Sequence, residues 1–80
     1  MRDELKSGKE PMLLFETTHL TMKAEDLFRK NNIPNMLFPK PKKAVSECGL
    51  VVKLFESDLE RARELCINSG IEIKEVIRIY

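Results

Sequence analysis

The spacing of apolar and polar positions changes several times along the chain. A nearly continuous apolar run at residues 11–18 predicts a strand that is covered on both faces. In residues 18–32 the apolar positions recur every three or four residues, which predicts an amphipathic helix capped by Thr17 or Thr18. A short second strand is expected at residues 35–39. The expected buried stripe of the helix consists of Leu20, Ala24, Leu27 and Phe28.

Two further segments have strand-like patterns. Residues 50–55 are apolar except for Lys53, which we expect to mark the solvent side of a third strand. Residues 71–80 alternate like a strand, with isoleucine at every second position on either side of Glu75-Val76. The alternation changes phase at that pair, which is typical of a β-bulge.

The clearest helix signal lies in residues 57–70. Ser57 and Glu60 have the spacing of a capping box, and Gly70 is a typical C-terminal stop. Cys66 falls on the apolar stripe of this helix, so we expect it to be a buried, structural residue. The stripe as a whole consists of Leu59, Ala62, Leu65 and Cys66.

The resulting order is strand, helix, strand, strand, helix, strand. This order is typical of an α+β, ferredoxin-like βαββαβ domain, in which two helices cover one face of a four-stranded antiparallel sheet. The first and third strands are then central, and the second and fourth are edges. We expect residues 11–80 to form this single domain and residues 1–10, which are polar and aperiodic, to be a flexible lead-in.

The composition argues against several classes of function. The chain has 80 residues, 34% of them charged, and a net charge of +1, which gives no general attraction to nucleic acid or to membranes. The apolar runs are too short to span a bilayer, and no export signal is visible, so we expect a cytoplasmic protein with free thiols. His19, Cys48 and Cys66 lack the spacing of a zinc site, so we expect no metal and no cofactor.

The candidate chemistry is at Cys48. The predicted topology places it at the end of the sheet where the first helix begins, beside Thr18 and His19. Unpaired N–H groups at a helix N-terminus and the positive charges of nearby lysines both favour a thiolate over a thiol, although Glu47 opposes them. The connection that carries Cys48, residues 39–49, is longer than an ordinary hairpin loop and includes Lys40, Lys42 and Lys43.

Structural interpretations of the same residues stay open. A cysteine is often a small buried hydrophobe, and a histidine in a first helical turn is often only a solvated polar residue. The lysines of residues 39–49 are either a solubilising loop or contacts for an anion or a partner. Gly49 either allows a turn that a β-carbon would prevent or lets a ligand or partner approach the main chain.

The chain resembles a small bacterial family described as "putative selenium/sulfur carrier protein-like". The resemblance rests on Thr18-His19, Ala24-Glu25, Pro39-Lys40-Pro41 and Cys48-Gly49, in that order along most of the domain. It implies that Cys48 carries sulfur or selenium as a persulfide or perselenide, received from a cysteine desulfurase-type donor and passed to a protein acceptor. Thr18 and His19 would then support the carrier thiol, and Cys66 has no counterpart in the motif.

Two other functions compete with a carrier. One is a non-catalytic interaction or regulatory module that pairs as a homodimer or binds a partner through an open sheet face bearing Val51, Lys53, Arg78 and Tyr80. The other is RNA binding, for which the third strand offers only Phe55 as an aromatic stacking residue. We therefore expect no nucleic acid among the partners.

Overall fold

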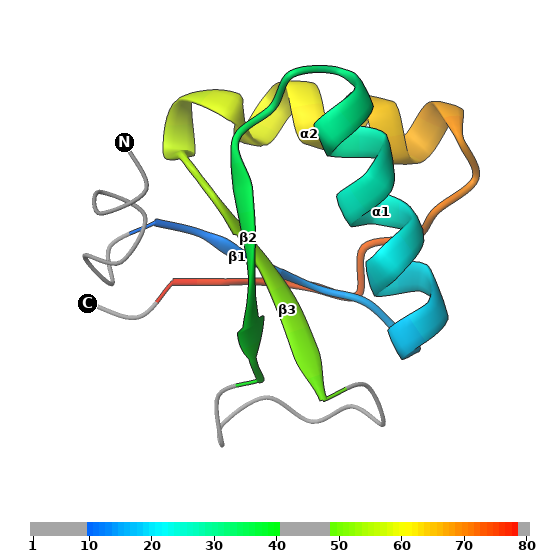
Figure 1. Cartoon of the computed structure of the whole chain (residues 1–80), viewed down its shortest axis with the longest axis vertical. Coiled ribbons are helices and arrows are strands. Elements are labelled where there is room, and N and C mark those ends of the chain that lie inside the picture. The colour runs from blue at the N-terminus through cyan, green and yellow to red at the C-terminus, as the bar shows by residue number, and fades with distance from the viewer. Residues whose placement is uncertain (1–9, 41–48, 79–80) are drawn as a thin grey trace.

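The computed structural model describes residues 10–40 and 49–78, so of the expected lead-in at residues 1–10 only Glu10 is described. The order of elements agrees with the expectation, and every element except β2 is shorter than expected. The elements are β1 (Met12–Leu14), α1 (Thr18–Lys30), β2 (Asn35–Pro39), β3 (Leu50–Leu54), α2 (Leu59–Asn68) and β4 (Glu75–Ile77), with a 3₁₀ turn at Glu56–Asp58 before α2 (Figure 1).

The strands form one antiparallel sheet in the order β2-β3-β1-β4. β1 and β3 are therefore the central strands, and β2 and β4 are the edges, as the sequence predicted. Both helices lie over the same face of this sheet (Figure 1), because one buried cluster joins their apolar stripes to a single set of strand residues. A four-stranded antiparallel sheet with two helices confirms the expected α+β class.

The core has two parts because β1 is buried on both faces. Leu13 points to the helices and packs in the cluster that contains Phe28 of α1 and Cys66 of α2. Its neighbours Met12 and Leu14 belong to a second cluster on the opposite face of the sheet. Burying one leucine or phenylalanine side chain contributes about 1.5–3 kcal/mol, so the helix-side cluster dominates the stability.

The expectation that Lys53 marks a solvent side is wrong. Its exposed fraction is only 6%, and its Nζ lies 4.4 Å from the centroid of the Phe38 ring. The aliphatic stem of a lysine packs well in an apolar setting, and the aromatic ring attracts the ammonium group. Val51 on the same strand is fully buried, so the sheet face expected to be open for a dimer is closed at both positions.

The start of α1 follows the sequence pattern. Thr17 is the N-cap, and its Oγ1 accepts a hydrogen bond from the Leu20 backbone N–H at 3.2 Å. Thr21 is also buried, and its hydroxyl donates to the Thr17 carbonyl at 3.0 Å, which satisfies the polar atom inside the core. The two threonines together fix the direction in which the chain leaves β1.

The start of α2 differs from the expected capping box. Asp58 occupies the N-cap position and makes no side-chain capping hydrogen bond. The chain first forms the 3₁₀ turn, in which the Asp58 N–H donates to the Phe55 carbonyl at 3.0 Å, so Ser57 lies inside a turn and not at the cap. Glu56 in the same turn accepts two hydrogen bonds from Arg78, at 3.0 and 2.8 Å, and the lowered pKa of its carboxyl follows from them.

Both helices end in the same way, with one residue in the left-handed conformation. Asn32 has φ 60° after α1, and Gly70 has φ 72° after α2. The next residue then folds back, so that Ile33 N–H donates to the Phe28 carbonyl at 2.9 Å and Ile71 N–H to the Cys66 carbonyl at 2.8 Å. These are the hydrogen bonds of a Schellman motif, and they bury both isoleucines. The predicted stop at Gly70 is confirmed.

The phase change predicted in the last strand is present. Lys74 N–H donates to the Leu14 carbonyl at 2.8 Å, although the ladder pairs Leu14 with Glu75. This hydrogen bond is shifted by one residue relative to the ladder, so the side-chain alternation changes where β4 begins. As a result Ile73 and Val76, three positions apart, both pack against the helix-side cluster.

We predict that Gly70→Ala lowers the free energy of unfolding by about 1 kcal/mol, because a β-carbon disfavours the left-handed conformation. Urea unfolding followed by circular dichroism measures the change. Gly49→Ala is the matched control, since Gly49 has no positive φ and an added Cβ there meets no atom within 4 Å. Equal losses in the two variants would contradict this account.

Candidate functional site

At one side of the sheet, the ends of all four strands lie next to one another. We call this row of strand ends the rim. β1 ends at Leu14, which pairs with Val51 near the start of β3 and with Glu75 at the start of β4. The end of β2 lies there too, because Pro39 pairs with Leu50. Only three residues separate β1 from α1, so the first helical turn belongs to the rim (Figure 1).

The connection expected to carry the chemistry starts and ends at the rim. The Lys40 backbone N–H donates to the Gly49 carbonyl at 2.8 Å, which extends the β2–β3 ladder by one hydrogen bond. Lys42, Lys43 and Cys48 lie outside the described residues, so the proximity of Cys48 to His19 stays a prediction. The described residues fix only the two ends of this connection, at Lys40 and Gly49.

Gly49 does not have the left-handed backbone conformation of a turn that only glycine can form. It is exposed, its φ is outside the left-handed region, and a Cβ built on it meets no atom of the described residues within 4 Å. The suggestion that it allows a turn closed to other residues is therefore wrong. The remaining interpretation is that the space beside Gly49 admits a ligand or a partner.

Thr18 and His19 are both exposed in the first turn of α1. That turn contains no acidic residue, so nothing within it neutralises the partial positive charge of the helix N-terminus. Glu16, just before the helix, forms an ion pair with Lys74, whose Nζ is 3.2 Å from its carboxylate. This part of the rim is thus favourable for an anion such as a thiolate.

Cys66 is the free cysteine that the structure describes, and it is buried in the helix-side cluster. Burial raises the pKa of its thiol to about 11, because the thiolate would lose its hydration there. The thiol is therefore protonated and inaccessible at neutral pH. This confirms that Cys66 is a structural residue.

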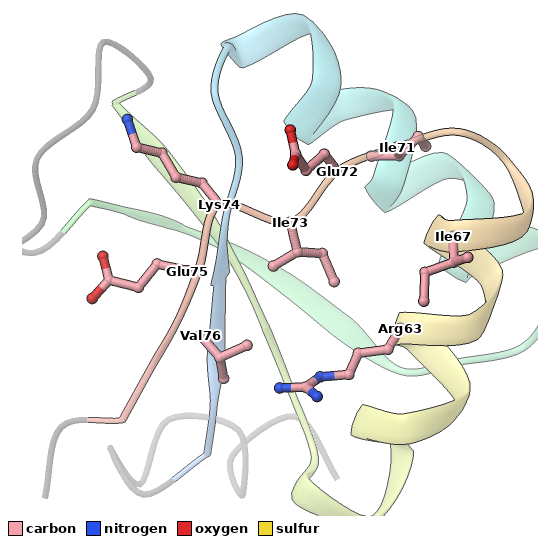
Figure 2. Close-up of a pocket in the computed structure, with 8 residues that line it drawn as sticks. All are labelled: Arg63, Ile67, Ile71, Glu72, Ile73, Lys74, Glu75 and Val76. Atoms are coloured by element: carbon pink, nitrogen blue, oxygen red, sulfur yellow. The ribbon is translucent and has the colours of Figure 1, made fainter.

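Sequence reasoning missed a groove between α2 and the segment that leads into β4. Its volume is about 450 Å³, and four of its eight lining residues are isoleucine or valine (Figure 2). Ile67, which lies one helical turn after Arg63 and off the apolar stripe, was the available signal. The groove is lined by Arg63, Ile67, Ile71, Glu72, Ile73, Lys74, Glu75 and Val76.

The described residues contain no group of three or more His, Cys, Asp or Glu side chains placed to hold a metal ion. Of the two helices described, neither is long and apolar enough to cross a membrane.

We predict that the Cys66 thiol makes stability fall in alkaline solution. The folded pKa is about 11, above the usual pKa near 8.5, so the folded state holds the proton more tightly. Stability is then complete below about pH 8.5 and declines by about 3 kcal/mol by pH 11 relative to a Cys66→Ala variant. Chemical unfolding of both proteins across this pH range measures the difference, and parallel curves would contradict the burial of this thiol.

The comparison with protein families identifies what kind of chain this is. The sequence model of the family described as "Putative Se/S carrier protein-like" matches residues 10–78. Because the match spans most of the sequence, the chain belongs to this family, and the resemblance seen in the sequence is confirmed. Searches of curated proteins and of solved structures gave no significant match.

Proposed function

We propose that the chain carries sulfur or selenium on Cys48. The observation that carries this proposal is the family match, which runs over residues 10–78 and so includes Cys48-Gly49. The donor is a cysteine desulfurase-type enzyme with a persulfide on its own cysteine, and the acceptor is another protein. The chain is an accessory to those enzymes in this scheme.

The transfer needs one nucleophilic displacement. The Cys48 thiolate attacks the outer sulfur of the donor persulfide, a new S–S bond forms on Cys48, and the donor S–S bond breaks. The donor cysteine leaves as a thiolate, so the numbers of atoms and electrons balance without an external oxidant. Passing the atom to the acceptor repeats the same displacement in the opposite sense.

The state of Cys66 supports the assignment of Cys48. The chain has two cysteines, and a carrier thiol must meet a bulky protein donor and be available as a thiolate. Cys66 satisfies neither condition, because it is fully buried and its pKa is raised to about 11. Carrier chemistry on this chain therefore depends on Cys48.

The charge distribution of the rim supports a thiolate on Cys48. The first turn of α1 has no acidic residue, and Glu16 is already paired with Lys74. We assign Thr18 and His19 as groups that donate hydrogen bonds to the thiolate or persulfide. Lys40, Lys42 and Lys43 supply positive charge that attracts the donor, and the open space beside Gly49 lets the donor approach the main chain.

We also assign the ferredoxin-like arrangement to this fold. The element order and the sheet order β2-β3-β1-β4 with antiparallel pairing support it. The assignment matters for the site, because this arrangement brings the start of α1 and the β2–β3 connection to one edge of the sheet.

We predict that the reduced protein gains the mass of one sulfur atom after incubation with a cysteine desulfurase and cysteine. Intact-protein and peptide mass spectrometry should place the sulfur on Cys48. Cys48→Ala should abolish the gain, and Cys66→Ala, the matched control that removes the buried thiol, should leave it unchanged. An adduct of equal yield in Cys48→Ala would overturn the proposal.

A second prediction concerns the reactivity of Cys48. Its apparent pKa, measured from iodoacetamide alkylation rates against pH, should lie below the usual value of about 8.5. His19→Gln or Lys40→Gln should move it upward, since each removes a group that favours the thiolate. Lys30→Gln is the control, because Lys30 is at the far end of α1 and pairs with Asp26 at 2.9 Å. A Cys48 pKa that none of these changes affects would contradict the role assigned to the rim.

A further inference from the structure

The groove between α2 and β4 has an exposed apolar residue on its wall. Ile67 is 73% exposed, and the other large hydrophobic side chain exposed among the described residues is Met22, at 46%, on α1. Opposite Ile67, the side chains of Ile73 and Val76 point toward α2 and form the far wall (Figure 2). The groove thus combines an apolar projection with an apolar hollow.

The two ends of the groove carry opposite charges. Figure 2 shows Arg63 at one end and Glu72 at the other, with Ile67 and Ile73 between them. Within the part of the chain that the structure describes, neither charged side chain has an ion-pair partner. The other two charged lining residues, Lys74 and Glu75, point away from α2, and Lys74 pairs with Glu16.

The adjacent edge of the sheet is poorly suited to adding another strand. β4 has only three residues, and the regular pairing with β1 ends at Glu75. Short strands, bulges and edge charges are the usual features that prevent strand pairing at a sheet edge. An occupant of the groove would therefore bind through side chains above the edge, by contact with α2, Ile73 and Val76.

We propose that the groove binds the same groove of a second copy of this chain. A two-fold axis through the groove centre exchanges its ends, so Arg63 of each copy meets Glu72 of the other. The same operation directs each Ile67 toward the hollow formed by Ile73 and Val76 of the other copy. A surface that carries a projection, a hollow and both charges is complementary to itself, as an isologous interface requires.

This dimer goes beyond the proposed carrier function, because no part of it uses Cys48. The groove is lined by eight residues, fewer than the roughly 20–30 residues that each partner contributes to a standard interface. We therefore expect a weak association, with dissociation constants from tens of micromolar to about a millimolar.

Analytical ultracentrifugation of the full chain from about 10 μM to 1 mM tests the proposal. The wild type should shift toward dimer over this range, and Ile67→Glu should weaken the association at least about tenfold. Met22→Glu is the matched control, since it places the same charge at the other exposed hydrophobic residue, and it should dimerise like the wild type. Thermal unfolding confirms that both variants are folded, and Cys48→Ala should dimerise normally, which separates this test from that of the carrier function.

Reversing the charges of Arg63 and Glu72 tests whether these two residues meet in the dimer. Arg63→Glu alone and Glu72→Arg alone should each weaken dimerisation about tenfold, because each brings two like charges together. Mixing the two variants should restore dimers, since both contacts then join opposite charges. A chain that stays monomeric at 1 mM, or equal effects of Ile67→Glu and Met22→Glu, would overturn the proposal and leave the groove to a different protein partner. Dimers that form in each single-charge variant as in the wild type would also overturn it.

Discussion

The antiparallel pairing of β1 with both β3 and β4 is the constraint on which the structure depends. Without Met12–Leu14, β2 and β3 would be a hairpin and β4 would have no partner. These three residues also join the two hydrophobic clusters, because Leu13 packs toward the helices and its neighbours toward the other face. The end of β1 then sets the rim, where Leu14 accepts a hydrogen bond from Lys74 and Thr17 caps α1.

Much of this arrangement could be predicted from local signals. The continuous apolar run of β1 indicated burial on both faces, and the positions of Thr17 and Gly70 indicated where α1 starts and α2 ends. The phase change near Glu75 was visible in the sequence, because Ile73 and Val76, three positions apart, both face the core. Each of these signals depends on residues close together in sequence, so tertiary contacts did not need to be known.

The wrong predictions concern positions where contacts between residues far apart in sequence decide the local structure. The charge of Lys53 suggested that it faces solvent, yet its ammonium group lies over the Phe38 ring of the neighbouring strand. Ser57 has the spacing of a cap, but it lies in a 3₁₀ turn whose Glu56 is held by Arg78 of the last strand segment. The groove depends on how α2 lies relative to β4, and a single exposed Ile67 does not reveal that relation.

The two cysteines differ in how much of their role the sequence alone can predict. Helical periodicity is enough to place Cys66 in the core, and burial then raises the pKa of its thiol. Cys48 follows no such period, so its expected place beside the start of α1 depends on the predicted topology. Under the proposed carrier function, the buried and protonated Cys66 does not compete with Cys48. Helical periodicity therefore accounts for the buried cysteine, whereas the role proposed for Cys48 rests on family membership.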